Sequence, residues 1–90
     1  MATIRDYDVT VHNITASIKV NDKSKTSYAA LPTLAEIFSV TGKPVEVIHL
    51  EYCFAGCTAL TTPPAIPSSV TSMRNCFFYC TSLTTAPTIP

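Results

Sequence analysis

The sequence predicts a β-rich α+β solenoid: a short stack of about two clear repeats, preceded by a degenerate entry repeat and an N-terminal β-hairpin cap. Three observations lead to this prediction. The second half of the chain contains two copies of one 23-residue unit, the first 20 residues alternate between apolar and polar side chains, and eleven of the twelve charged residues lie in the first 51 positions. Ninety residues are enough for one domain and no more.

The repeat consists of two segments at an offset of 23, residues 44–66 (the first copy) and residues 67–89 (the second copy). Eleven of the 23 positions are identical. Neither copy can bury its apolar side alone, so the copies are expected to stack side by side. The identical pairs are Pro44/Pro67, Val47/Val70, Cys53/Cys76, Phe54/Phe77, Cys57/Cys80, Thr58/Thr81, Leu60/Leu83, Thr61/Thr84, Thr62/Thr85, Pro64/Pro87 and Ile66/Ile89.

A fainter copy occupies residues 24–43, where apolar positions fall one period before those of the first copy. A degenerate unit of this kind is typical of the entry to a repeat stack. The same stretch has Thr33 and Glu36 at the spacing of a capping box, which predicts a short helix ending at Gly42. Both interpretations place a helical turn here.

Within a copy the pattern changes from helical to extended. Val70, Met73, Phe77 and Cys80 are separated by three, four and three positions, which predicts one apolar face of a helix. Residues 84–90 are rich in threonine and proline and predict a short extended segment. Each unit is therefore expected to be a short helix, a turn and a short strand.

Residues 1–23 predict an antiparallel hairpin. Apolar side chains occupy odd positions from 7 to 11 and even positions from 14 to 20. The change of phase predicts a two-residue turn at His12 and Asn13. A charged hairpin at one end of a repeat stack is what an N-terminal cap requires.

The distribution of charge argues against several kinds of partner. Six basic and six acidic side chains cancel, so no net field attracts nucleic acid or an anionic membrane. The apolar stretches are far shorter than the roughly 20 residues of a membrane-spanning helix, so no membrane insertion is expected. Arg5 and Asp6 precede any apolar segment, so no signal peptide is expected. Beyond Glu51 the only charged residue is Arg74, which indicates a surface that something covers.

The four cysteines recur with the repeat, as Cys53 and Cys57 in the first copy and Cys76 and Cys80 in the second. Each Cys-x-x-x-Cys pair fits the ligand spacing of a zinc site. Equal phase in the two copies favours instead two ladders of small buried thiols. A neighbour spacing of about 4.8 Å also permits a disulfide. Buried thiols are the favoured interpretation, a disulfide and a zinc site are the alternatives, and no metal is predicted.

No group of residues predicts catalysis. The carboxylates show no paired spacing for acid–base chemistry, and Gly42 and Gly56 are too few for a phosphate-binding loop. His49 lies among apolar residues and its counterpart is Ser72, which favours a surface position over a nucleophile pair with a thiol. We therefore expect no enzyme, no catalytic residue and no cofactor.

The order Val-Thr-Ser-Met-x-x-Cys-Phe-x-x-Cys-Thr-Ser-Leu-Thr-Thr-x-Pro-x-Ile-Pro in residues 70–90 resembles the BspA-like class of leucine-rich repeats. The resemblance covers residues 44–90 well, the entry repeat faintly and residues 1–22 not at all. It implies a curved leucine-rich-repeat stack with short parallel strands on one face and helical turns on the other. It also implies protein binding, adhesion and display at a cell surface, without catalysis.

The candidate interaction site is the flank of the second copy. Phe78 and Tyr79 replace Ala55 and Gly56 of the first copy and have no structural need to be large. An uncovered final repeat would expose further apolar side chains, and large apolar patches usually mark interfaces. The candidate interface residues are Met73, Phe77, Phe78, Tyr79, Leu83 and Ile89.

Two functions fit these expectations. The first is a non-enzymatic protein-interaction module for surface recognition or adhesion, whose second copy packs on a protein partner or on another copy of the chain. The second is a small structural subunit of a larger particle or fibre, such as a virus or phage component in a virion or a cytoplasmic assembly. The low charge favours the second function, and the resemblance favours the first.

Overall fold

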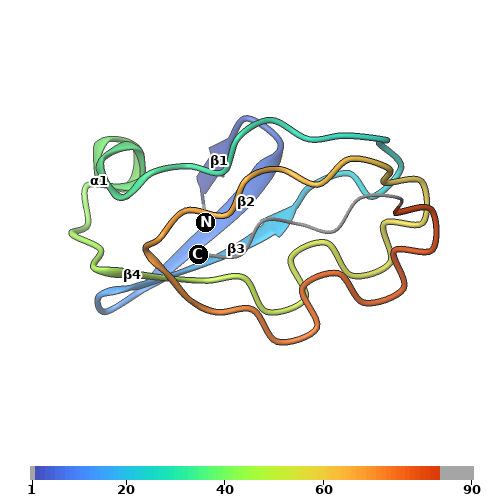
Figure 1. Ribbon diagram of the computed structural model, residues 1–90. Coiled ribbons are helices and arrows are strands. Elements are labelled where there is room, and N and C mark those ends of the chain that lie inside the picture. Colours follow the sequence, from blue (N-terminus) through green and yellow to red (C-terminus); the bar gives the residue numbers. More distant parts are fainter. Residues whose placement is uncertain (1, 84–90) are drawn as a thin grey trace.

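The computed structural model describes residues 2–83 of the chain. Over these residues, five strands form one mixed sheet in the order β1-β2-β3-β4-β5, and a single short helix packs against β1 (Figure 1). The elements are β1 (Ala2–Ile4), β2 (Tyr7–His12), β3 (Thr15–Val20), α1 (Leu34–Thr41), β4 (Val47–His49) and β5 (Val70–Ser72).

The N-terminal strands form an antiparallel meander. β2 pairs with β3 from Tyr7↔Val20 to His12↔Thr15, and β1 adds to the other side of β2. The predicted hairpin is confirmed, but its turn consists of Asn13 and Ile14, one residue later than expected. Asn13 has φ 54°, and asparagine adopts this left-handed conformation more readily than histidine at the first turn position.

The helix α1 begins and ends where its capping residues predict. The Thr33 side chain accepts from the backbone N–H of Glu36, and the Glu36 side chain accepts from the N–H of Thr33. Gly42 has φ 71° and donates its N–H to the Phe38 carbonyl at 2.8 Å. Ile37 is the fully buried residue of the helix and anchors it to the core.

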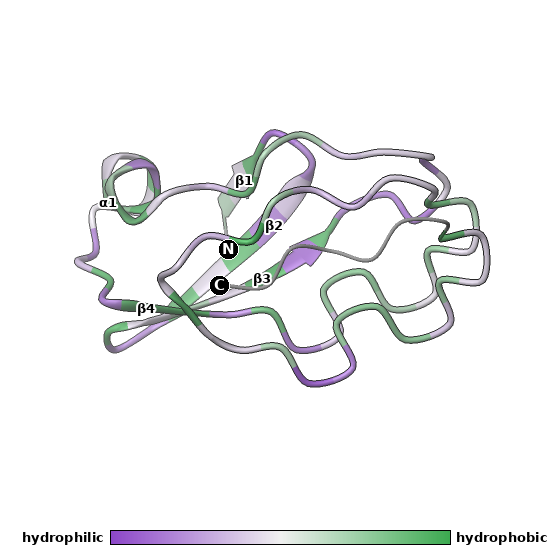
Figure 2. Cartoon of the chain, viewed as in Figure 1, coloured by the Kyte–Doolittle hydropathy of each residue, from purple (hydrophilic) through white to green (hydrophobic). Residues whose placement is uncertain are grey.

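The two copies of the repeat lie side by side and run parallel. β4 pairs with β3 on one side and with β5 on the other, both in parallel, with the register Ile48↔Val70 between the copies. After these strands both copies follow the same undulating path, which Figure 1 shows in green to yellow and in orange to red. Figure 2 shows that both undulating segments are largely hydrophobic.

The predicted fold class, a leucine-rich-repeat solenoid, is wrong for residues 2–83, which form one open five-stranded mixed sheet with one helix. The helix expected from Val70 to Cys80 is replaced by strand β5 and a series of tight turns. These turns need left-handed backbone at Asn75 and Tyr79, with φ 52° and 62°. The reason is hydrogen bonding: in a helix the N–H groups bond within the segment, whereas here every second N–H from Ile48 to Gly56 donates to a carbonyl of the second copy.

The expected entry repeat does not stack on the strand of the first copy. That strand's neighbour is the hairpin, since β3 pairs with β4 and the Val20 N–H donates to the Cys53 carbonyl at 3.2 Å. The expected entry repeat instead meets the later part of the first copy, where the Thr61 N–H donates to the Thr26 carbonyl at 2.9 Å. The extended segment expected after Leu60 is reduced to an isolated bridge between Ser27 and Thr62, because the prolines that follow cannot donate to a ladder. Its counterpart in the second copy, residues 84–90, lies outside the described residues.

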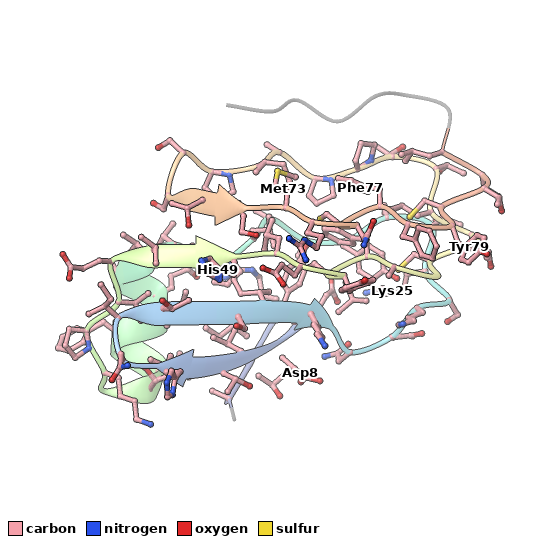
Figure 3. All side chains as sticks on the ribbon, turned by 90° about the horizontal axis from the view of Figure 1, so that it is seen from below. Asp8, Lys25, His49, Met73, Phe77 and Tyr79 are labelled. Atoms are coloured by element: carbon pink, nitrogen blue, oxygen red, sulfur yellow. The ribbon has the colours of Figure 1, made fainter. Side chains whose placement is uncertain are left out.

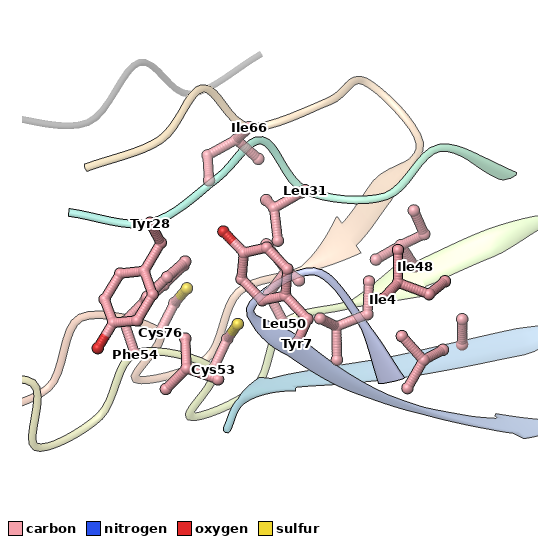
Figure 4. Close-up of a cluster of buried hydrophobic side chains, with 14 of the residues drawn as sticks. Ile4, Tyr7, Tyr28, Leu31, Ile48, Leu50, Cys53, Phe54, Ile66 and Cys76 are labelled. Carbon is pink, nitrogen blue, oxygen red and sulfur yellow. The ribbon is translucent and has the colours of Figure 1, made fainter. Parts of the chain in front are cut away.

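The core lies between the sheet and two irregular segments, residues 21–33 and 60–69. Figure 4 shows Tyr28, Leu31 and Ile66 from these segments facing Tyr7 and Ile48 from the sheet. The hydroxyl of Tyr7 donates to the carbonyl of Ala29, and that of Tyr28 to the carbonyl of Asp22. These bonds satisfy the polar ends of two buried rings.

Candidate functional site

The contact between the two copies shows what the flank of a copy offers to a neighbour. Four N–H groups at alternate positions of the first copy donate to four carbonyls at alternate positions of the second. The pairs are Leu50 to Ser72 (2.8 Å), Tyr52 to Arg74 (3.0 Å), Phe54 to Cys76 (2.8 Å) and Gly56 to Phe78 (2.8 Å). Backbone groups therefore join the copies well beyond the short strands β4 and β5.

Side chains at equivalent positions of the two copies also contact each other. Phe54 and Phe77 stack with ring centroids 5.2 Å apart and planes inclined by 6°. On its other side Phe54 contacts Tyr28 at 5.5 Å and, edge to face, Tyr7 at 6.1 Å. The aromatic column therefore starts in the hairpin and ends at Phe77, whose second face points away from the first copy.

The outer edge of the molecule is the flank of the second copy, residues 70–83. Its N–H groups equivalent to the four donors of the first copy are those of Met73, Asn75, Phe77 and Tyr79. None of the four has an acceptor within the described part of the chain. The carbonyls of the same residues already accept turn bonds, from the N–H groups of Cys76, Phe78, Cys80 and Thr81. The outer edge is thus a row of backbone donors.

Five of the six predicted interface residues belong to the described part of the second copy, and Figure 3 labels Met73, Phe77 and Tyr79 among them. Met73, Phe77 and Leu83 are half-buried and pack on the core with one side. Phe78 and Tyr79 are 47% and 67% exposed, and their ring centroids are 4.2 Å apart. Ile89 lies outside the described residues. The edge therefore combines backbone donors, a half-buried apolar row and an exposed aromatic pair.

The four thiols are free and differ in access. Cys53, Cys57 and Cys76 are buried, whereas Cys80 is half-buried on the outer edge. The Cys80 thiol donates to the Phe54 carbonyl at 3.1 Å, and Cys57 Sγ lies 3.5 Å from the Tyr28 hydroxyl oxygen. Burial raises the pKa of Cys80, so it is a poor nucleophile at neutral pH.

Within residues 2–83 no group of three or more His, Cys, Asp or Glu side chains is arranged to hold a metal ion.

A polar face of the sheet was not predicted from the sequence. Ser17, Lys19, His49, Glu51 and Tyr52 line a shallow hollow on the open side of β3 and β4. This face was missed because a helix had been expected where the parallel strands lie. Its polar side chains also join the copies: the Ser72 hydroxyl donates to Glu51 at 3.0 Å, and the Asn75 amide donates to the Tyr52 hydroxyl at 2.9 Å.

The main ion pairs lie far from the outer edge, at the opposite end of the sheet order. Arg5 binds Glu36, and Lys25 Nζ lies 2.6 Å from Asp6 Oδ1. The Arg5 guanidinium, followed by the Thr33 N–H, lowers the pKa of Glu36 to about 2. The N–H of Ala29, followed by Lys25, lowers the pKa of Asp6. These pairs attach the irregular segment and α1 to the meander.

Within the described residues, no helix is both long and apolar enough to span a membrane. Comparison of the chain with protein-family models, with curated proteins and with solved structures finds no match.

Proposed function

We propose that this protein is a non-enzymatic protein-interaction module that binds a protein partner through the outer edge of its second copy. The observation that carries the proposal is the combination of exposed Phe78 and Tyr79 with a row of backbone N–H groups that have no acceptor among residues 2–83. Aromatic residues are enriched at the centres of interfaces, and an open sheet edge binds extended segments of other chains.

Sequence comparison of the two copies supports this proposal. Where the first copy has Ala55 and Gly56, the second has two large aromatic residues. The backbone at Tyr79 is left-handed, φ 62°, a conformation that costs a residue with a side chain roughly 1–2 kcal/mol. Burial in the core does not explain a large residue at this strained position, because the Tyr79 ring contacts Phe78 and two thirds of the residue is exposed. Contact with a partner would explain it. The resemblance of residues 70–90 to BspA-like repeats agrees with recognition or adhesion.

The first copy itself provides the variant that tests the proposal. In the double variant Phe78→Ala/Tyr79→Gly, the second copy acquires the residues that the first copy carries at the same backbone positions, so folding is expected to be retained. Partner capture should weaken about 30-fold, the effect of losing an aromatic hot spot of roughly 2 kcal/mol. The matched control is Phe38→Ala on α1, where the ring is 54% exposed on a different surface.

Capture is measured by immobilising each variant, exposing it to the same protein mixture and quantifying every bound protein. A partner is counted only if the double variant loses it and the Phe38→Ala variant keeps it. Equal capture by all three chains would contradict the proposal.

The second candidate function is a structural subunit of a larger assembly. It is favoured by the scarcity of charge after Glu51, which leaves Arg74 as the only charged residue of the second copy. Sedimentation velocity over a wide concentration range separates the two functions. An assembly subunit forms large species as concentration rises, whereas a recognition module stays small until its partner is added.

A further inference from the structure

The structure assigns a polarity to the outer edge: we infer that its occupant is an extended segment of a partner protein that runs parallel to the second copy and offers a row of backbone carbonyls. This inference rests on the proposed function, since it takes the outer edge as the binding surface. It goes further by stating which backbone groups the partner must present and which arrangements of the chain itself are excluded.

The first step is the one-sided hydrogen-bonding capacity of the edge. Met73, Asn75, Phe77 and Tyr79 present free N–H groups within the described residues, while their carbonyls accept turn bonds. An ordinary sheet edge alternates donors and acceptors. This edge offers donors only over these positions, so a partner must bring acceptors at the same spacing.

The second step is the direction of the partner. The same four donor positions in the first copy are occupied by the second copy, which runs parallel to it. The outer edge repeats this geometry one step further out, with Phe77 stacked on Phe54 and half-buried. A parallel segment therefore meets the donors in the register already observed, and it places apolar side chains over Met73, Phe77 and Leu83.

The third step excludes a two-fold dimer through this edge. In such a dimer the same surface of each chain meets its own copy. Here the N–H row of one chain would face the N–H row of the other, and neither would find acceptors. Burying N–H groups without acceptors removes their bonds to water and returns none, which disfavours the arrangement.

The fourth step excludes head-to-tail association of intact chains. The carbonyls of the second copy that could serve as acceptors are already bonded to the first copy. On the opposite flank of the first copy, the hairpin occupies the equivalent positions: β3 pairs with β4, and Val20 donates to the Cys53 carbonyl. Within residues 2–83, neither flank of another molecule of this chain offers a free carbonyl row of this kind, and the remaining sheet edge, β1, spans only three residues. We therefore assign the acceptors to a different protein.

A fused probe tests the inference directly. Residues 67–83 carry the carbonyl row that the first copy recognises, so they serve as the probe segment. They are appended to the full chain through a flexible Gly/Ser linker of about 12 residues, which provides a high effective concentration. The control carries the same linker and the same residues in scrambled order.

The measurement is amide hydrogen exchange of Met73, Asn75, Phe77 and Tyr79. In the unfused chain these amides should exchange rapidly, while those of Leu50, Tyr52, Phe54 and Gly56 are protected. In the fusion all four outer amides should slow about 100-fold, and in the scrambled control they should not.

Unchanged exchange in the fusion would overturn the inference, as would equal slowing in the scrambled control. A concentration-dependent dimer of the unfused chain that protects the same four amides would also overturn it, because a self-complementary edge would then exist. That dimer would leave the outer edge as a binding surface, so the proposed function would survive. Loss of partner selectivity in the aromatic variants bears on the proposed function alone.

Discussion

The two copies of the repeat have similar sequences and different surroundings. Within the described residues the first copy lies between the hairpin and the second copy, whereas the second copy has a neighbour on one flank only. Leu60 and Cys57 are completely buried, yet their equivalents Leu83 and Cys80 are half-buried. The difference teaches that burial in this molecule comes from the neighbouring segment, and that within residues 2–83 one flank of the second copy has no such segment against it.

The largest expected effect compares two equivalent leucines. Leu60→Ala should lower the free energy of unfolding by about 2–5 kcal/mol, because it leaves a cavity in a fully enclosed site. Leu83→Ala should cost only about 1–2 kcal/mol, since the site is already open on one side. Chemical denaturation of both variants measures the difference. Equal losses would mean that the flank of the second copy is covered in solution.

Thiol reactivity sharpens the same comparison. Cys80 should react with a thiol reagent such as DTNB at least tenfold faster than Cys53, Cys57 or Cys76, which become accessible only when the chain opens. The rapid phase should be absent in Cys80→Ser, which is the control. If Cys57 reacts as fast as Cys80, the thiols of the two copies are equally accessible to the reagent and the comparison fails.

A smaller effect is expected at the left-handed position shared by Gly56 and Tyr79. Gly56→Ala should lower stability by about 1 kcal/mol, because φ is 78° and a side chain is strained there even though its Cβ would make only an ordinary contact with Lys23 Nζ at 3.7 Å. Tyr79→Gly should raise stability by up to about 1 kcal/mol by removing the same strain. Thermal unfolding of both variants decides this. A stability loss in Tyr79→Gly would show that the exposed ring has a structural role.

The smallest expected effect is a loss of stability at low pH. It tests whether the meander loses stability independently of the two copies. The folded-state pKa of Glu36 is about 2, below its ordinary 4.5, so its contribution to stability is present above pH 4.5 and is lost as the pH falls towards 2. Asp6 acts in the same direction. Solvent screening keeps the effect small, because the Glu36 side chain is 39% exposed.

Glu36→Gln provides the control for this prediction, because it should flatten the decline in stability between pH 4.5 and pH 2. Amide exchange should show the loss first around α1 and the β1–β2 turn, which the Arg5–Glu36 pair joins. Earlier loosening of the second copy would contradict this assignment.

Local signals in the sequence predicted the local elements of the fold. Alternation of apolar residues predicted the hairpin, and the capping box at Thr33 with Gly42 predicted the helix bounds. The offset of 23 predicted that equivalent residues such as Phe54 and Phe77 lie against each other. Each of these signals depends on residues close in sequence or on exact repetition.

The conformation inside a copy could not be predicted in this way. The spacing of Val70, Met73, Phe77 and Cys80 fits a helix, and it fits equally a series of tight turns three or four residues apart. Which of the two forms depends on whether the N–H groups bond within the segment or to a neighbour, and that is a tertiary contact. For the same reason side-chain types could single out Phe78 and Tyr79 as candidate contact residues, whereas the row of backbone donors could be recognised only in the structure.

The separation of partners along the chain has a consequence for the order of folding. Paired residues in the hairpin are between 3 and 13 positions apart, but β3 meets β4 across 32 positions, as in Thr15↔Val47. Hairpins close in roughly 1–10 μs, and more distant parallel pairings are slower because a longer loop must be ordered first. The hairpin thus forms early and provides the edge on which the first copy docks, and the first copy then provides the edge for the second. Since synthesis also releases the hairpin first, the chain is built outward in the order in which it leaves the ribosome.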